Sequence, residues 1–388
     1  MFQDDIARLA LNVASAQSAN DRMQCVVESK LLDFNQEKSC FTIFGSNKER
    51  NKLLDEMSVT PLLLNGKPMV HGTVVKYLGD YLSEKGLADS VNVTVCKRSG
   101  LVRKAIYDVR SVIDDCRSQM LGGLVSGIQI WEIAVIPMLL NNSETWQDLS
   151  GKTLKELEKL QITFLRCLLA VGSGCPIPLL YSETGILLME FRILEKKLMF
   201  LHHLAHLPET SLAREVFTVQ TDYGLPGIAQ DCREFLARFG LQNLSRFSKS
   251  QFKRIVKAKI HELNKCKIIE QVRNRNYKKI DIEKLSKDDF EMKTYLKELK
   301  VDDARLRFKI VSHMTPSVKM NFPSDRLFTN TLWACEGCKS ESDVGLRDTQ
   351  HHIINCEAYK EFRQGKDLAR DLDLVEYFRN VLNQRMKS

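Results

Sequence analysis

The feature that most limits the fold of this chain is the recurrence of apolar residues at helical spacing from about residue 92 onward. One helix is indicated by an apolar stripe that ends before Gly172-Ser173-Gly174 and consists of Leu154, Leu157, Leu160, Phe164 and Leu168. A second helix is predicted over residues 193–206, packed beside the first. Its His202, His203 and His206 are interpreted as ordinary histidines on the helix face. We therefore predict an α+β fold that is predominantly α-helical.

The first 90 residues mix the patterns of helix and strand. Helical spacing over residues 14–32 precedes a strand-like run at 40–44. Asn65-Gly66 between apolar runs predicts a hairpin with a type I′ turn, and residues 74–78 predict another strand that ends at Gly79-Asp80. The first 90 residues are therefore expected to hold a small sheet beside helix.

The composition indicates a folded protein of a reducing compartment. Of the 388 residues, 44% are apolar and 27% are charged, which is ordinary for a protein of two or three domains. Several of the 11 cysteines lie within apolar stretches, as Cys167 does. No basic-then-apolar signal pattern and no membrane-spanning run is evident, so we expect a nuclear or cytoplasmic location without a membrane partner.

One segment accounts for the whole net charge of +8. Residues 245–280 contain 12 basic residues against Glu262 and Glu270, a balance of +10 that leaves about −2 elsewhere. An apolar stripe of Phe252, Val256, Ile260 and Leu263 predicts a helix with its cations on the other faces. Such a face is either simply solvated or binds phosphates through counterion release, and Tyr277 could stack on a base. The candidate nucleic-acid-binding residues are Lys249, Lys253, Arg254, Lys257, Arg273, Arg275, Tyr277, Lys278 and Lys279.

A cysteine and histidine cluster near the C-terminus has the spacing of a zinc site, C-x2-C-x13-H-x3-C. Its candidate ligands are Cys335, Cys338, His352 and Cys356. His352 and Cys356 would share one helix face, whereas the alternative ligand His351 would lie off it. A thioredoxin-type redox loop and plain buried thiols are the competing interpretations. The sequence predicts that this short segment folds around zinc.

Four motifs occur in a specific order along the chain: Phe2-Gln3-Asp4-Asp5, then Val75-Lys76-Tyr77-Leu78-Gly79, then a helical region, then the cysteine and histidine cluster. The helical region includes Leu157-Glu158-Lys159-Leu160-Gln161, Cys175-Pro176-Ile177-Pro178 and Glu183-Thr184-Gly185. Together with Lys30 to Ser39, which is similar to a further palm motif, they resemble the C-terminal half of a non-LTR (LINE-type) retrotransposon reverse transcriptase.

The resemblance implies a role for each part. It implies a partial polymerase palm over 1–90, a helical thumb over 91–215, a basic connector over 216–330, a zinc knuckle over 331–360 and a terminal helix over 361–388. Asp4 and Asp5 would be the remnant of the metal-binding pair, with magnesium only in an intact enzyme, and Tyr77, Leu78 and Gly79 would form the primer-grip hairpin. Knuckles of this family often use an H-x4-C spacing, which favours His351.

The chain departs from the family where polymerisation would need it most. The first catalytic aspartate of the palm and the fingers precede the Asp-Asp box in the family, and two-metal catalysis needs carboxylates from both motifs. We expect a fragment that binds RNA or DNA, takes no small-molecule substrate and does not polymerise by itself. The alternatives are an active reverse transcriptase whose N-terminal half is missing from the gene model, and an inert interaction remnant with a zinc-stabilised turn.

Overall fold

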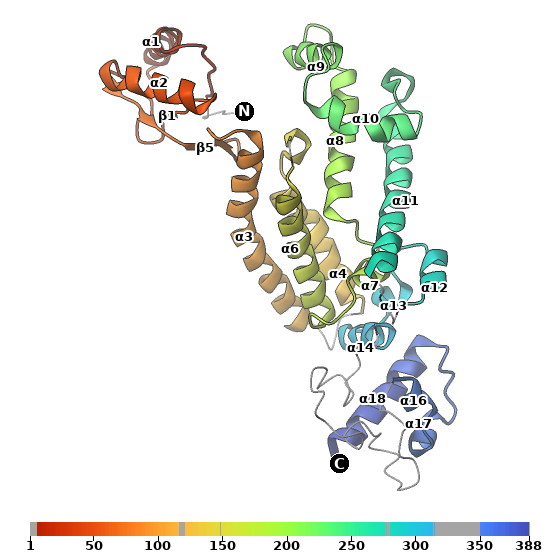
Figure 1. Cartoon of the computed structure of the whole chain (residues 1–388). Helices are drawn as coiled ribbons and strands as arrows, with labels where there is room; N and C mark the ends of the chain where they lie inside the picture. The colour runs from red at the N-terminus through yellow and green to blue at the C-terminus, as the bar shows by residue number, and fades with distance from the viewer. Residues whose placement is uncertain are drawn as a thin grey trace. The chain divides into compact units, whose positions relative to one another are not determined.

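The computed structural model describes residues 6–115, 121–147, 149–275, 277, 280–312, 314 and 350–387, and in the last range the side chains of 353–384. Helices form most of this part of the chain, and the strands are short and lie in the N-terminal region coloured red to orange (Figure 1). The predicted α+β, mainly helical class is confirmed. The boundaries of the five predicted segments stay a prediction.

Two capped helices open the described chain. Helix α1 spans Val13–Ser29, and α2 spans Asn47–Val59. Each begins with a capping box, in which the side chain of Asn12 or Ser46 accepts a hydrogen bond from the backbone N–H of the residue three positions later. Neither helix has a buried residue. Their formation is therefore driven by local signals, and packing adds little.

The strands pair in three separate two-stranded sheets. These are β1 (Cys40–Phe41) parallel to β4 (Val70–His71), β2 (Leu63–Leu64) antiparallel to β3 (Lys67–Pro68), and β5 (Val74–Tyr77) antiparallel to β6 (Asp80–Ser83). Asn65 and Gly66 have φ of 50° and 70°, so the predicted hairpin is confirmed. The strand predicted over 40–44 is shorter than expected, because residues 42–44 pair with no other strand in the described chain.

After residue 86 the described part of the chain is mostly helical. A π-helical turn at Trp131–Val135 precedes Pro137, whose missing N–H cannot continue the α-helical pattern. The longer helices are α3 (Leu87–Asp115), α4 (Gly123–Ile130), α6 (Gly151–Leu169), α7 (Ile177–Thr184), α8 (Met189–Ala205), α9 (Leu212–Asp222), α10 (Ile228–Arg238), α11 (Lys249–Arg275), α14 (Val301–Val311) and α18 (Asp371–Lys387). Shorter helices are α5 (Ile136–Leu139), η2 (Ser143–Thr145), η3 (Leu244–Arg246), α12 (Ile282–Lys287), α13 (Thr294–Glu298), α16 (Gln350–Asn355), η6 (Glu357–Tyr359) and α17 (Lys360–Arg363).

The chain divides into two compact units. One comprises Met1–Leu101, Met138–Leu157 and Lys196–Phe252, and the other comprises Val102–Pro137, Glu158–Glu195 and Lys253–Ser388. In the second unit, the fully buried Trp131 stacks on Phe164 with ring centroids 4.2 Å apart. A smaller apolar cluster around Ile353, Tyr377 and Phe378 packs α16 and α18 together.

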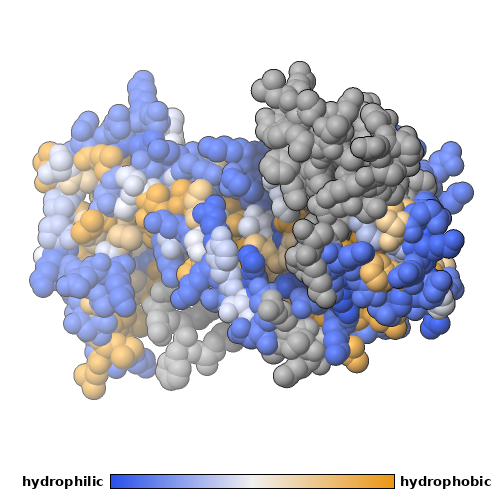
Figure 2. Space-filling model, turned by 90° about the horizontal axis from the view of Figure 1, so that it is seen from below, coloured by the Kyte–Doolittle hydropathy of each residue, from blue (hydrophilic) through white to orange (hydrophobic). Residues whose placement is uncertain are grey.

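The helices predicted from apolar spacing are present. Leu157, Leu160, Phe164 and Leu168 are buried along α6, which ends at Leu169 just before the predicted glycine stop. Helix α8 contacts α6 as expected, since Arg192 Nε donates to Gln161 Oε1 at 3.2 Å. Hydrophilic side chains cover most of the coloured surface in Figure 2, with separate apolar patches between them. No helix in the described ranges is both long and apolar enough to cross a membrane.

Candidate nucleic-acid interface

Helix α11 carries the basic segment, and its buried side is set by a four-residue repeat. Phe252, Val256 and Ile260 are fully buried, as the sequence predicted, whereas Leu263 is half-buried. The next position of the repeat is Asn264, whose Oδ1 accepts a hydrogen bond from the Leu188 N–H at 3.0 Å. Four residues advance about 40° beyond one helical turn, so the buried stripe winds around α11. The stripe continues through Ile268 and Val272.

Six of the predicted cations lie on the exposed sides of this helix. They are Lys249, Lys253, Arg254, Lys257, Arg273 and Arg275, and all six side chains are exposed. None of these six side chains has an ionic or hydrogen-bonded partner in the described part of the chain. Exposed cations without counter-charges attract polyanions. These six residues, three of them in the stretch 253–257, are the central element of the candidate interface.

Other cations of α11 already have hydrogen-bonded or ionic partners within the protein. Lys267 Nζ pairs with Glu190 at 2.5 Å, and Lys265 Nζ donates to the Asp288 carbonyl oxygen at 2.5 Å. Lys259 pairs with Glu262 one turn away at 3.0 Å. These three lysines were not among the predicted binding residues. The structure thus separates structural cations from the exposed ones.

The C-terminal end of α11 brings an aromatic ring next to the cations. Arg273 and Arg275 belong to the last turn of the helix, and the half-buried Tyr277 follows directly. Lys278 and Lys279 lie outside the described residues. Tyr277 lines a pocket with residues of the loop that joins α6 to α7.

The predicted Tyr77-Leu78-Gly79 segment forms a tight hairpin turn between β5 and β6. Tyr77 pairs with Asp80, and the two turn residues Leu78 and Gly79 have φ of 48° and 88°. This left-handed conformation costs a leucine about 1–2 kcal/mol. Leu78 is also 49% exposed at the tip, so its side chain does not offset the cost by burial.

A buried arginine holds this turn in place. Arg98 of α3 is 7% exposed, and its Nη2 donates to the Gly79 carbonyl oxygen and to Asp80 Oδ1, both at 2.8 Å. Its Nη1 donates to the carbonyl oxygens of Leu139 and Asn141, at 3.2 and 2.8 Å. Burial lowers the pKa of the Arg98 guanidinium, and the nearby Asp80 opposes this by favouring the charged form.

Asn142 holds the same turn from the other side. Its Nδ2 donates to the Leu78 carbonyl oxygen at 3.2 Å and to Asp80 Oδ2 at 2.9 Å. Arg98 also lies over the buried Trp146 ring, 5.9 Å from its centroid. Neither Arg98 nor Asn142 stands out in the sequence, because their partners, backbone carbonyls and the Asp80 carboxylate, are brought close only by the fold. The turn is therefore a rigid, anchored element with an exposed tip.

The predicted metal ligands are described only in part. Cys356 is 2% exposed and directly follows α16, the helix that contains both His351 and His352. The side chains of these histidines, all of Cys335 and Cys338, and the pair Asp4 and Asp5 lie outside the described residues. Within the described residues no group of three metal-binding side chains occurs. The choice between His351 and His352 stays open, and the zinc site stays a prediction.

The histidines of α8 have packing partners. His202 is 4% exposed, stacks on Phe252 with centroids 4.7 Å apart, and hydrogen-bonds the Phe247 carbonyl oxygen through Nε2 at 2.9 Å. His206 Nδ1 hydrogen-bonds the His202 carbonyl oxygen at 2.8 Å. These contacts join α8 to the start of α11.

Comparison of the chain with protein-family models, with curated proteins and with solved structures gave no match.

Proposed function

We propose that this chain is a reverse-transcriptase-like protein segment that binds RNA or DNA and does not polymerise DNA by itself. The observation that carries the proposal is the row of exposed, unpartnered cations on α11. Cations that meet phosphates release condensed counterions, and this supplies affinity without base recognition. Six cations of this helix have no partner in the described chain, whereas Lys259 and Lys267 pair with carboxylates and Lys265 donates to a carbonyl oxygen.

Two further parts would each contact nucleic acid in their own unit. The anchored turn presents the exposed Leu78 beside Gly79, as expected of a hairpin that meets a primer end. The predicted zinc knuckle of Cys335, Cys338, His352 and Cys356 would hold a second contact region in shape, because zinc fixes four ligands in a tetrahedral arrangement. Zinc would serve structure in this role, and Asp4 and Asp5 alone are too few carboxylates for two-metal catalysis.

The proposal is tested by binding of a labelled single strand at several salt concentrations. If about four phosphates are contacted, affinity falls roughly fifty-fold between about 50 and 200 mM salt. A triple variant, Lys253→Gln with Arg254→Gln and Lys257→Gln, should lose most of this salt dependence. An affinity that does not change with salt would contradict the electrostatic interface.

A matched control removes the same charge elsewhere. Lys97, Arg103 and Lys104 are exposed cations of α3, and changing all three to glutamine alters the net charge equally. The control should bind nearly as tightly as the unchanged chain. An equal loss in both triple variants would show that net charge, and not the α11 face, determines binding.

Two other measurements test the remaining parts. Metal analysis of the purified chain should find one zinc ion per chain, and Cys335→Ser with Cys338→Ser should abolish it. Primer extension on an RNA template by the purified chain would contradict the statement that it does not polymerise by itself.

A further inference from the structure

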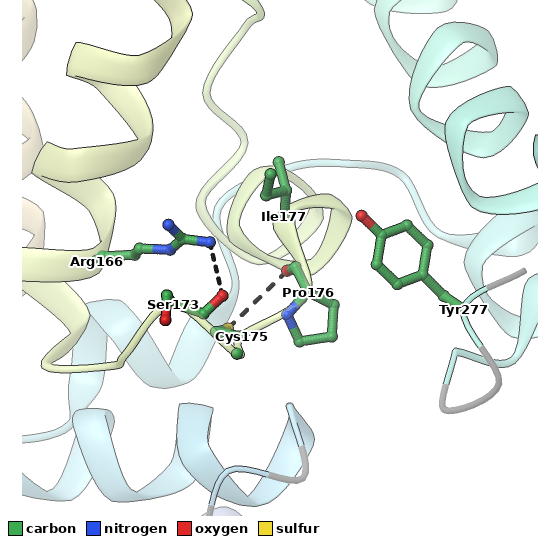
Figure 3. Close-up of a pocket in the computed structure, with 7 residues that line it drawn as sticks. Arg166, Ser173, Cys175, Pro176, Ile177 and Tyr277 are labelled. Atoms are coloured by element: carbon green, nitrogen blue, oxygen red, sulfur yellow. Dashed lines mark hydrogen bonds between the residues drawn. The ribbon is translucent and has the colours of Figure 1, made fainter. Parts of the chain in front are cut away.

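A pocket of about 280 Å³ lies between the end of α6, the start of α7 and Tyr277. Figure 3 shows Arg166 reaching toward the loop at Ser173, with Tyr277 on the opposite side of Pro176 and Ile177. The described residues that line it include one charged group, Arg166, and no carboxylate. A pocket with this lining favours an anionic group.

Arg166 has donors that the protein does not use. Its Nη2 donates to the Ser173 carbonyl oxygen at 3.0 Å, while its buried Nε has no hydrogen-bond partner in the described chain. A buried donor without a partner is costly, and an arginine fork is suited to phosphate oxygens. A phosphate accepting from the free side of this guanidinium would offset part of that cost.

The loop beside Arg166 leaves its backbone open. A side chain added at Gly172 would meet nothing within 4 Å, and one at Gly174 would meet only the end of Met314 at 3.8 Å. Glycines without covering side chains allow a phosphate to approach the main chain closely. Cys175 of the same loop also lines the pocket, and its thiol adds no negative charge near neutral pH because burial raises its pKa to about 11.

The opposite wall is apolar and aromatic. Besides the loop at Ser173, the pocket is lined by Pro176, Ile177 and Tyr277. A base stacks on such a ring whatever its identity. Tyr277 also follows Arg273 and Arg275, so the unpartnered cations of α11 end at this pocket.

We infer that the pocket takes one nucleotide, with its phosphate at Arg166 and the glycine loop and its base against Tyr277. The inference rests on the proposed nucleic-acid binding and adds to it a defined subsite. The nucleotide belongs either to a bound strand or to a free mononucleotide, and the test separates the two sources.

The first measurement is fluorescence anisotropy with a short labelled oligo(dT). Tyr277→Ala should weaken binding about tenfold, and Tyr277→Phe, which keeps the ring, should stay within about twofold. Tyr223→Ala is the matched control, because Tyr223 is a 77% exposed tyrosine away from the pocket lining, and it should bind as the unchanged chain does. Arg166→Gln should weaken binding about tenfold, as expected for a lost charged hydrogen bond. If Arg166→Gln fails to fold, the Tyr277 pair decides.

The second measurement is saturation-transfer NMR with thymidine monophosphate, and with thymidine as the control without phosphate. If thymidine monophosphate gives signals with the unchanged chain and none with Tyr277→Ala, free nucleotides also bind in the pocket. If the variants change only the binding of oligo(dT), the pocket takes a nucleotide of a bound strand. If Tyr277→Ala and Arg166→Gln bind both oligo(dT) and thymidine monophosphate as the unchanged chain does, while the α11 triple variant loses oligo(dT) binding, the pocket inference is wrong and the proposed function stands. If the unchanged chain binds neither probe, both are wrong.

Discussion

Replacing Arg98 by alanine should release the β5–β6 turn from the helices that hold it. The change removes two hydrogen bonds to the turn, at Gly79 and Asp80, and two to the carbonyl oxygens of Leu139 and Asn141. Removing one partner of a fully buried ion pair costs about 3–5 kcal/mol. The Asp80 side chain is 19% exposed and keeps Asn142, so we expect a smaller cost of about 2–3 kcal/mol.

This cost should appear as local opening of the turn. Hydrogen exchange measured by mass spectrometry on a peptide covering residues 74–83 should be roughly 30- to 150-fold faster in Arg98→Ala. Arg110→Ala is the control, because Arg110 forms an exposed pair with Asp114 and its loss costs only about 0.3–0.5 kcal/mol.

A double-mutant cycle makes the prediction sharper. Asp80→Asn combined with Arg98→Ala should show an interaction energy of at least about 1 kcal/mol, since the two groups are in direct contact. Unchanged exchange of the 74–83 peptide in Arg98→Ala would refute the reasoning, because the turn would then hold its shape without the buried guanidinium.

Three further predictions concern the helical part of the chain. Phe164→Ala should lower the free energy of unfolding by about 3–5 kcal/mol in denaturant titrations, because Trp131 loses its stacking partner, whereas the exposed Tyr107→Ala should change it by less than about 0.5 kcal/mol. Desolvation raises the pKa of the Glu158 carboxyl in the folded chain. Its favourable contribution to the free energy of unfolding is therefore complete below the ordinary glutamate pKa and is lost as the pH rises through the raised pKa. The free energy of unfolding should therefore fall over this range relative to Glu158→Gln, and parallel pH profiles would contradict this. Burial raises the pKa of Cys175 to about 11, so iodoacetamide at pH 8 should label the exposed Cys25 and leave Cys175 intact in peptide mass spectra.

Much of the local structure follows from short-range patterns. The stripe from Leu157 to Leu168 predicts α6 because four apolar residues at helical spacing favour one buried face in any globular context. Asn65-Gly66 predicts its hairpin because both residues accept positive φ at low cost. The concentration of cations on α11 is likewise visible without a structure.

Other features depend on residues distant in the chain. Asn264 occupies a buried position on α11 only because the Leu188 N–H lies there to donate to it, and no spacing rule foresees that partner. Leu263 fits the apolar pattern but is half-buried, because the four-residue repeat of buried positions runs through its neighbour Asn264 instead. The strands of the first 90 residues were over-predicted in length, since pairing partners and not propensity decide where a strand ends.

Short-range sequence patterns suffice to predict that this chain is mainly helical, where several of its helices lie, and that one helix carries the excess positive charge. Those properties depend on neighbours within a few residues, whose geometry is the same wherever the helix packs. Long-range packing gives Lys265 a carbonyl oxygen and Lys267 a carboxylate as partners, while it leaves Lys253 and Lys257 without any in the described chain. It also decided that Arg98 holds a turn, and that Arg166 and Tyr277 line one pocket. Such features arise from long-range packing, because burial and hydrogen bonding assign a role to each charge only after the helices have come together.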